Sequence, residues 1–415
     1  MSGIAIDQTP IDNINPGIKC DCTSNNGSTC HITQLRVYAL DVFGPLPDEL
    51  WNLTFLTNLN LGQNYLTGPI PASIANLTRM QYLSLGINAL SGQLPRELGL
   101  LTDLIVLSFS TNNFTGRLPP ELGSLSRLTQ MYFDSSGVSG PIPETFANLR
   151  SMEIMWASDN ELTGRIPDFI GNWSSLTTLR LQGNSFQGLI PQSFSNLTAL
   201  NDLRISDVAN GSSSLDFLRG MTSLSTLMLR NNNISGSIPS FFGSFQSLTL
   251  LDLSFNNFTG TVPESLLNHS SLTHLFLGNN RLTGTLPSQR SSSLRTIDLS
   301  YNGLSGGLPP WISGQNLQLN LVSNNFTISS SNSSSLPSGL NCLQRNFPCG
   351  RGNPTYSSFA MNSGGRPVRS ADQVLFESDN ETLGPATYYV TTTRRWAFQS
   401  EDLQLKELWC DLNQK

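Results

Sequence analysis

A repeat of 24 residues constrains the fold of this chain more than any other feature of its sequence. One copy, residues 56–71, reads LTNLNLGQNYLTGPIP, and the same frame returns along the chain, tightening to 22 residues after Asn280. One repeat cannot bury its own leucines, so such a chain builds its core by stacking copies. Thirteen copies fit between about residues 32 and 325, and the position of Asn64, called here the ladder position, is occupied by Leu40, Asn64, Asn88, Asn112, Ser136, Asn160, Asn184, Val208, Asn232, Asn256, Asn280, Asn302 and Asn324.

The Leu-x-Leu segment of each copy predicts a short β-strand, because alternate residues of a strand point to the same side. We therefore expect an α/β solenoid: a right-handed superhelix with a parallel concave β-sheet and short 3-10 helices or loops on the convex side. The ladder asparagine falls where the chain turns inward, and its amide can bond backbone groups of its own coil and of the adjacent one. We expect Ser136 to replace part of this bonding, and Leu40 and Val208 to replace none.

Most copies also carry a glycine followed three residues later by proline, as in Gly68 and Pro71. The glycine permits a tight turn, and the proline fixes φ and removes a donor. This Leu-x-Gly-x-Ile-Pro segment resembles the plant-specific class of leucine-rich repeats, found in receptor-like kinases and in secreted inhibitors of cell-wall polygalacturonases. Eleven of the thirteen copies carry the glycine or glycine-proline feature, and the Val208 copy and the last one lack it.

Cysteines flank the repeats, and the long middle of the chain has none. This placement indicates caps tied by disulfides in an oxidising compartment. At the N-terminal end we predict a disulfide between Cys20 and Cys30, with Cys22 left open as the alternative partner of Cys30. A zinc site formed by these cysteines and His31 is less favoured, because Cys-x-Cys does not match the usual zinc spacing. We expect no metal or cofactor.

Composition narrows the possible partners. Charged residues make up 13% of the chain, about half of the usual share, and the net charge is −6. No phosphate-neutralising surface is predicted, so we expect no nucleic-acid partner. No apolar run approaches the roughly 18–20 residues of a membrane helix. The first residues, MSGIAID, lack the basic and apolar regions of a signal peptide, and we expect an incomplete or processed chain.

The sequence after the repeats resembles part of one plant receptor group. Cys342 and Cys349 follow the last repeat and are predicted to form a C-terminal cap disulfide. The segments YSSFAMNSGG (356–365) and FESDNETLGPATYYV (376–390) resemble the opening of a malectin-like domain, as in one group of plant leucine-rich-repeat receptor-like serine/threonine kinases. The predicted domains are an N-terminal cap at 1–31, repeats at 32–325, a C-terminal cap at 326–353, a truncated malectin-like start at 354–398 and an unrelated tail at 399–415.

This resemblance implies an extracellular location at the plasma membrane, with a kinase domain in the full-length relatives. It also implies that a complete malectin-like domain would bind cell-wall carbohydrate. The chain itself contains no Gly-rich phosphate loop with its lysine, no His-Arg-Asp and no Asp-Phe-Gly motif, so we expect that it is not an enzyme.

The variable residues of each strand are expected to face outward on the concave sheet. In the column four residues before the ladder position, aromatic and arginine side chains gather, and these types are enriched in binding hot spots. Neighbouring strands lie about 4.8 Å apart, so successive members of the column touch. The alternative is that Arg180, Arg204 and Asp207 merely pair across strands and keep the sheet soluble. The predicted ligand-binding residues, in this and adjacent columns, are Tyr132, Trp156, Arg180, Arg204, Asp207, Arg230, Asp252 and Phe276.

The chain contains thirteen Asn-x-Ser/Thr sequons, and nine of them follow the repeat in two phases. One phase lies twelve residues before the ladder position, on the outer side, and the other lies just after the strand. No sequon falls in the exposed strand columns, so the concave face is expected to stay free of sugar. The predicted glycosylation sites are Asn52, Asn76, Asn113, Asn172, Asn196, Asn233, Asn257, Asn268 and Asn325.

Two functions from different classes are compatible with these features. The first is an extracellular recognition module of a plant leucine-rich-repeat receptor-like kinase, which binds a peptide or protein ligand and a co-receptor. The alternative is a secreted protein, similar to polygalacturonase inhibitors, that binds a cell-wall hydrolase. The malectin-like resemblance favours the first, because inhibitor chains of this type end after the C-terminal cap. A fragment without function is a third possibility.

Overall fold

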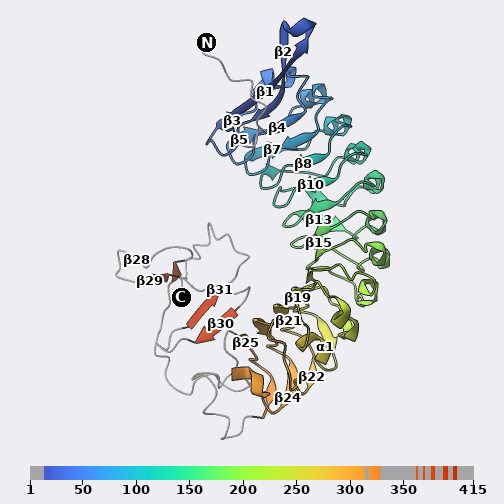
Figure 1. Cartoon of the computed structure of the whole chain (residues 1–415), viewed down its shortest axis with the longest axis vertical. Coiled ribbons are helices and arrows are strands. Elements are labelled where there is room, and N and C mark those ends of the chain that lie inside the picture. The colour runs from blue at the N-terminus through green and yellow to red at the C-terminus, as the bar shows by residue number, and fades with distance from the viewer. Residues whose placement is uncertain are drawn as a thin grey trace, which may run out of the picture.

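The computed structural model describes residues 14–313 and 317–327, together with the backbone of five short strands between residues 361 and 399. Figure 1 shows the repeats stacked into a curved solenoid, with the main sheet along its inner side and the short helices along its outer side. The predicted α/β solenoid is confirmed.

The main sheet has fourteen strands in the part of the chain described. All neighbouring pairs are parallel except β1 with β2, which form an antiparallel hairpin at the N-terminal edge. The thirteen strands from β2 onward correspond to the thirteen predicted copies. In sheet order the strands are β1 (Gly17–Ser24), β2 (Thr29–Arg36), β4 (Asn58–Asn60), β6 (Tyr82–Ser84), β8 (Val106–Ser108), β10 (Gln130–Tyr132), β12 (Ile154–Trp156), β14 (Thr178–Arg180), β16 (Asp202–Arg204), β17 (Thr226–Met228), β19 (Leu250–Asp252), β21 (His274–Phe276), β23 (Thr296–Asp298) and β25 (Gln318–Asn320).

Smaller parallel sheets run along one flank, where each coil turns after the ladder position. Their strands are β3 (Phe43–Pro45), β5 (Tyr65–Gly68), β7 (Ala89–Gly92) and β9 (Asn113–Phe114); β11 (Ser139–Gly140), β13 (Glu161–Gly164) and β15 (Ser185–Phe186); β18 (Ser235–Ser237) and β20 (Asn257–Thr259); and β22 (Thr283–Gly284), β24 (Gly303–Gly306) and β26 (Asn325–Phe326).

The outer side carries one short helix in most coils. Proline precedes most of these helices in an extended conformation, which fixes where each helix begins. The helices are η3 (Asp48–Asn52), η4 (Ala72–Asn76), η5 (Arg96–Leu100), η6 (Pro120–Ser124), η7 (Glu144–Asn148), η8 (Asp168–Asn172), η9 (Gln192–Asn196), η10 (Asp216–Leu218), η11 (Ser240–Ser244), α1 (Glu264–Leu267) and η12 (Pro310–Ser313), with η2 (Asn25–Gly27) in the hairpin turn.

The leucines of the repeat form one continuous core between the two sides. In the strand column five residues before the ladder position, Leu59, Leu83, Met131 and Leu203 are all at most 1% exposed. Trp51 and Trp173 are equally buried in the layer beneath the helices. Each coil buries its apolar face against its neighbours, which is why the sequence period alone predicts the architecture.

The ladder asparagines bond as predicted. Asn256 Nδ2 donates to the carbonyls of Leu229 in the preceding coil (2.8 Å) and Leu253 in its own coil (3.1 Å), while its Oδ1 accepts the N–H of Ile234 (3.0 Å). Repetition of this pattern satisfies buried turn groups that neither helix nor sheet would pair.

Ser136 and Val208 interrupt this ladder in different ways. The buried Ser136 hydroxyl donates to Asn160 Oδ1 (3.0 Å), so it bonds to the following coil. Val208 contributes only its backbone N–H, which donates to Asn232 Oδ1 (3.1 Å). The absence of replacement at valine is confirmed. The expected partial replacement by serine is wrong, because the Ser136 hydroxyl bonds the Asn160 side chain and, among the described residues, makes none of the backbone bonds that a ladder asparagine such as Asn112 makes.

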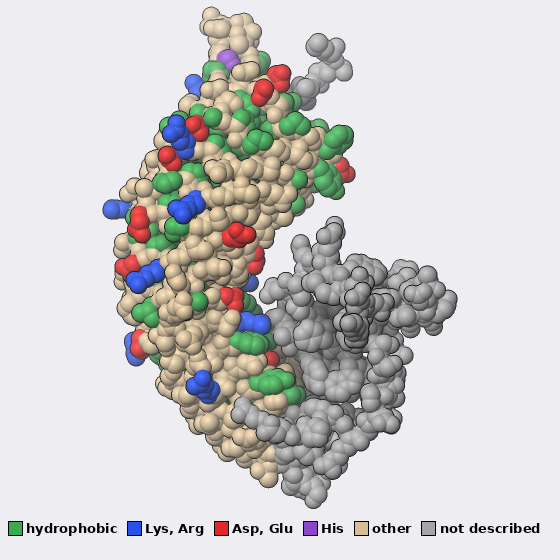
Figure 2. All heavy atoms as spheres, turned by 180° about the vertical axis from the view of Figure 1, so that it is seen from behind, with side chains coloured by type: hydrophobic (Ala, Val, Ile, Leu, Met, Phe, Trp, Pro, Cys, Tyr) green, Lys and Arg blue, Asp and Glu red, His purple; other side chains and the backbone are tan. Residues whose placement is uncertain are grey.

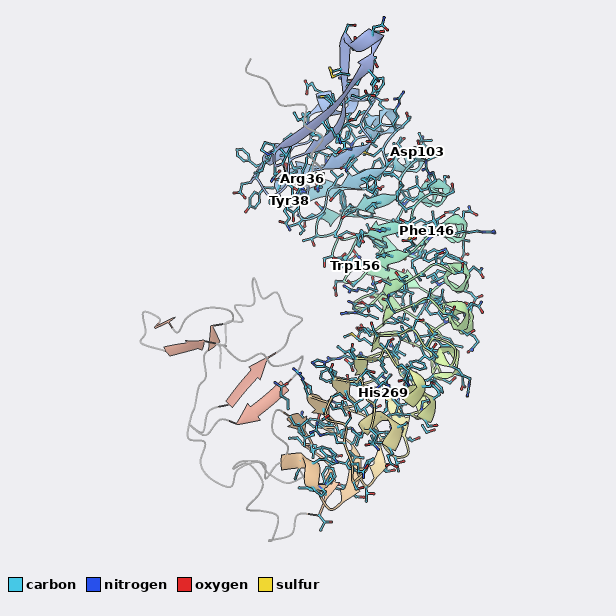
Figure 3. All side chains as sticks on the ribbon, viewed as in Figure 1. Arg36, Tyr38, Asp103, Phe146, Trp156 and His269 are labelled. Atoms are coloured by element: carbon cyan, nitrogen blue, oxygen red, sulfur yellow. A yellow bond between two sulfur atoms is a disulfide. The ribbon has the colours of Figure 1, made fainter. Side chains whose placement is uncertain are left out.

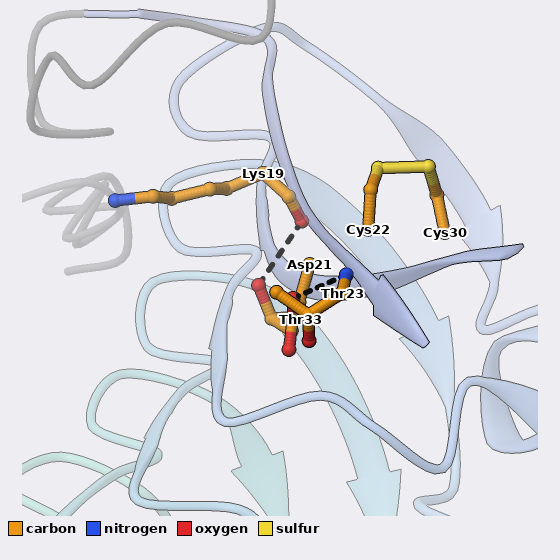
Figure 4. The surroundings of a disulfide bond; sticks show 6 residues. All are labelled: Lys19, Asp21, Cys22, Thr23, Cys30 and Thr33. Carbon is orange, nitrogen blue, oxygen red and sulfur yellow. Dashed lines mark hydrogen bonds between the residues drawn. A yellow bond between two sulfur atoms is a disulfide. The ribbon is translucent and has the colours of Figure 1, made fainter. Parts of the chain in front are cut away.

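The N-terminal hairpin settles the cysteine pairing. Cys22 and Cys30 form the disulfide, with Cα atoms 3.9 Å apart (Figure 4). Cys20 is a free thiol. The predicted Cys20–Cys30 pair is therefore wrong, and the alternative left open is correct. The reason is register. Cys20 lies opposite Ile32 across the hairpin, whereas Cys22 and Cys30 come together in the irregular stretch of the pairing nearer the turn. The bond also occupies two of the candidate zinc ligands.

Most of the C-terminal predictions concern residues beyond those described. Cys342, Cys349 and Cys410 lie outside the described residues. Within the predicted malectin-like span only backbone strands are described: β27 (Met361–Asn362), β28 (Val368–Arg369), β29 (Leu375–Ser378), β30 (Thr387–Val390) and β31 (Trp396–Gln399). Among the described residues, no helix has the length and apolar character needed to cross a membrane.

Candidate recognition surface

Strand register brings four of the predicted ligand-binding residues into one row across the main sheet. Tyr132 of β10 is opposite Trp156 of β12, which is opposite Arg180 of β14, which is opposite Arg204 of β16. All four side chains are partly exposed. Figure 3 shows Trp156 on the inner side of the arc, while Phe146 of η7 lies toward the outer side. We call these four residues the concave row.

Aromatic and cationic groups of the concave row contact each other directly. The rings of Tyr132 and Trp156 meet edge to face, with centroids 5.1 Å apart. The Arg180 guanidinium lies over the Trp156 ring, 4.1 Å from its centroid. Such contacts contribute on the order of 0.5–2 kcal/mol each and hold the side chains in one arrangement. The indole N–H of Trp156 has no hydrogen-bond partner among the described residues.

Asp202, which the sequence analysis did not select, organises the two arginines. Arg180 donates to Asp202 Oδ2 through Nη2 (2.8 Å) and Nε (3.1 Å), and Arg204 Nε donates to Asp202 Oδ1 (2.9 Å). Asp202 is 8% exposed, so its carboxylate is held among the strands rather than in solvent. The signal was present in the sequence, because Asp202 precedes Arg204 by two residues and therefore shares its face of the strand.

This pairing answers the alternative interpretation in part. Arg180 does pair across strands, with Asp202 of β16, whereas Arg204 pairs with Asp202 within its own strand, and neither contact involves Asp207. Asp207 is exposed, and its carboxylate accepts hydrogen bonds from Asn231 Nδ2 (2.7 Å) and from the neighbouring Ser206 hydroxyl. The ion pairs leave part of each guanidinium exposed: the side chains of Arg180 and Arg204 are 25% and 28% exposed. Both arginines can therefore still contact a ligand.

Toward the C-terminal end of the sheet, the other predicted ligand-binding residues are less exposed. Arg230 is half-buried and its guanidinium lies 4.5 Å from the centre of the Phe255 ring. Asp252 and Phe276 are only 4% and 5% exposed, so the prediction that they face solvent is wrong. Asp252 turns back on its own chain and accepts hydrogen bonds from the N–H (2.9 Å) and hydroxyl (2.6 Å) of Ser254.

Burial also governs the carboxyl groups in this region. It raises the pKa of Asp252 above its usual value, although the hydrogen bonds from Ser254 and the charge of Arg230 act in the opposite direction. The pKa of Asp298 is raised for the same reason. Phe276 lies between these two residues in the same register row.

The sequons occupy the two surfaces that their phases indicated. Asn52, Asn76, Asn172 and Asn196 end the outer helices η3, η4, η8 and η9, and Asn268 follows α1. Asn113, Asn233, Asn257 and Asn325 lie in or beside the flank strands, where Asn257 is half-buried and the others are exposed. Occupancy by glycans remains a prediction.

Comparison with known proteins decides the type of solenoid. A family model described as leucine rich repeat matches residues 222–282, and a second model of the same description matches residues 55–77, 103–125, 175–197 and 293–315. The fold is a leucine-rich-repeat solenoid. A probable leucine-rich-repeat receptor-like serine/threonine-protein kinase of Arabidopsis thaliana is 55% identical over 116 residues, which are 28% of this chain and 11% of that kinase. The chain thus matches only a small part of the length of its curated relative.

This leucine-rich-repeat solenoid is similar to solved ectodomains of plant receptors. The plant peptide hormone receptor RGFR1, solved in complex with RGF2, superposes with a TM-score of 0.66 at 30% identity, covering 71% of this chain and 48% of that one. The Arabidopsis receptor kinase HAESA, solved with the peptide hormone IDA and the co-receptor SERK1, superposes with a TM-score of 0.54 at 28% identity, covering 70% and 57%.

Proposed function

We propose that this solenoid is the extracellular ligand-recognition module of a plant leucine-rich-repeat receptor-like kinase. Its concave row would bind a peptide or small protein, and a co-receptor kinase would join the complex. The observation that carries the proposal is the row from Tyr132 to Arg204, in which two aromatic rings and two arginines are partly exposed and already held by mutual contacts. Ordering these side chains in advance lowers the entropy that binding must overcome.

The relatives and neighbours support the same proposal. The curated relative is a probable receptor-like kinase, and RGFR1 and HAESA were solved with peptide hormones. The kinase activity would belong to a part of the longer protein that this chain does not span. We further propose that residues 354–398 begin a malectin-like domain, which rests on the sequence resemblance alone, and that the solenoid is glycosylated and faces the cell exterior.

A binding assay with surface variants tests the function. The chain, secreted from plant cells, is immobilised and exposed to a panel of synthetic secreted plant peptides and to purified fungal polygalacturonase. At least one peptide should bind, and Trp156→Ala and Arg180→Ala should each weaken its binding tenfold or more, about 1.4 kcal/mol. Arg127→Ala is the matched control, because Arg127 pairs with Asp103 away from the concave row (2.7 Å).

Two outcomes would overturn the proposal. One is peptide binding that neither Trp156→Ala nor Arg180→Ala weakens, which would place the ligand elsewhere on the solenoid. The other is a panel in which no peptide binds and the polygalacturonase is inhibited. That result would support the hydrolase-binding alternative.

A further inference from the structure

An exposed apolar patch lies on the flank at the N-terminal end, away from the concave row. Phe43 is 84% exposed and Tyr65 is 62% exposed, and Leu40 (39%) and Val42 (38%) adjoin them. We call these four residues the flank patch. Hydrophobic side chains gather at this end of the flank in the space-filling view (Figure 2). Large exposed side chains that lie together, rather than singly, indicate an interaction site.

Backbone pairing fixes the arrangement of the flank patch. Phe43 of β3 is opposite Tyr65 of β5 in parallel register, and the N–H of Tyr65 donates to the carbonyl of Val42 (2.8 Å). The patch is therefore built on paired strands, not on a loose loop. Substitution of Phe43 or Tyr65 should leave the core intact, because neither side chain contributes to it.

The patch ends at a strand edge that no other strand of the described residues pairs with. β3 is the terminal strand of the sheet β3-β5-β7-β9, whereas β1 covers the corresponding edge of the main sheet. Inside the flank, the third residue after the ladder position donates its N–H to the preceding coil, as Ser139 does to Gly116 (2.7 Å) and Thr115 does to Gly92 (2.8 Å). Phe43 is the equivalent residue of the first coil, and its N–H has no such acceptor among the described residues. An open edge of this kind is a template for another strand.

The charges around the edge select the kind of partner. Asp41 lies within the patch sequence, and Asp48 and Glu49 follow in η3, and all three are exposed. A second copy of the chain would add its own Asp41, Asp48 and Glu49 to this edge, and like charges brought together in an interface oppose association. A partner with lysine or arginine beside its apolar residues would complement them.

The glycosylation pattern leaves this end accessible. The flank sequons begin at Asn113 in β9, and the same position in the earlier coils is held by Asp41, Tyr65 and Ala89. No glycan is therefore expected beside the flank patch, whereas the flank beyond it carries several sequons.

We propose that β3 and the flank patch form a second binding surface, which takes an extended segment of a partner protein, apolar and basic, by strand addition. A backbone carbonyl of the partner would accept a hydrogen bond from the N–H of Phe43, and the partner segment would continue the flank sheet. Its apolar side chains would cover Phe43 and Tyr65, and its cations would lie near Asp41. This surface is separate from the concave row, so ligand recognition and this contact can occur together.

Two synthetic ten-residue peptides test the proposal, one of alternating valine and lysine and one of alternating valine and glutamate. We measure their affinity for the intact chain, and we follow hydrogen–deuterium exchange across residues 41–45, where residues 41–44 carry the amide hydrogens. The valine-lysine peptide should slow exchange at these amides and bind at least tenfold more tightly than the valine-glutamate peptide.

Three variants make the test specific. Phe43→Ser should abolish the protection at residues 41–45. Asp41→Asn should reduce the preference for the basic peptide, and asparagine suits the positive φ of 54° at this position. Tyr301→Ser is the matched control, because Tyr301 is similarly exposed (52%) but lies at the opposite end of the solenoid, and it should change nothing.

Other results would overturn the inference. Equal binding of both peptides, or protection confined to residues outside 41–45, would exclude a basic strand at this edge. Concentration-dependent dimerisation by light scattering that Phe43→Ser abolishes would assign the edge to a second copy instead. Because the peptide probes do not involve the concave row, these outcomes are independent of the proposed receptor function.

Discussion

His269 stands where other coils bury an apolar side chain. The same position, eleven residues before the ladder asparagine, is Leu77, Leu125 or Phe245 in other coils, and His269 is itself only 4% exposed. Its Nδ1 accepts the N–H of Leu272 (3.2 Å), and Nε2 has no hydrogen-bond partner among the described residues. Burial lowers the pKa of His269 below its ordinary value of 6.5, and the carbonyls of Phe242 and Phe245 offset this only in part.

The buried histidine should make stability depend on pH. Because its folded-state pKa is depressed, the unfolded state takes up the proton first as the pH falls below about 6.5. The free energy of unfolding should therefore decrease as the pH falls from 7.5 to 5, and the loss attributable to His269 should vanish in His269→Leu. Urea denaturation of both proteins across this range measures the difference. Parallel curves for the two proteins would show that His269 is not responsible.

At the scale of elements, glycines in several outer helices allow these helices to lie close to the helix of the next coil. A Cβ atom on Gly123 in η6 would lie 2.4 Å from the carbonyl oxygen of Thr145 in η7, and one on Gly99 in η5 would lie 2.3 Å from that of Glu121 in η6. Backbone cannot move aside as a flexible side chain can. These glycines therefore help set the spacing between coils, and that spacing determines how the strands of the concave row lie side by side.

Gly123→Ala should destabilise the solenoid by about 1–3 kcal/mol, the usual cost of forcing an extra methyl group into a packed site. Gly220→Ala is the control, because the nearest atom to a Cβ there is the Ser195 carbonyl oxygen at 3.7 Å. Thermal unfolding followed by circular dichroism should show a lower midpoint for Gly123→Ala alone. Equal midpoints for the two variants would mean that the helices can separate without cost.

The whole molecule divides its surface among different tasks. The outer helices and much of the flank carry the sequons, the concave row carries aromatic and arginine side chains, and the flank patch is free of sequons. A curved stack of coils permits this division, because each position of the repeat generates one stripe along the molecule. A stripe then acquires its own chemistry through substitution in successive coils.

Glycopeptide mapping and enzymatic deglycosylation check this division. Glycans should be found at the outer and flank asparagines, and their removal should change the affinity for the peptide ligand less than twofold, because none of these sites lies in the concave row. A tenfold loss of affinity after deglycosylation of a chain that remains folded would mean that sugars contribute to the ligand site.

The sequence by itself determined the solenoid, the number of coils, the concave position of the row and the role of the ladder asparagines. It could do so because every coil repeats the same local contacts, and a period is visible without coordinates. Only the tertiary structure decided that Cys22 rather than Cys20 pairs with Cys30, that Asp202 joins Arg180 to Arg204, and that Asp252 and Phe276 are buried. Those outcomes depend on hairpin register, and on contacts between residues that are 22 to 24 positions apart in the chain and adjacent in space.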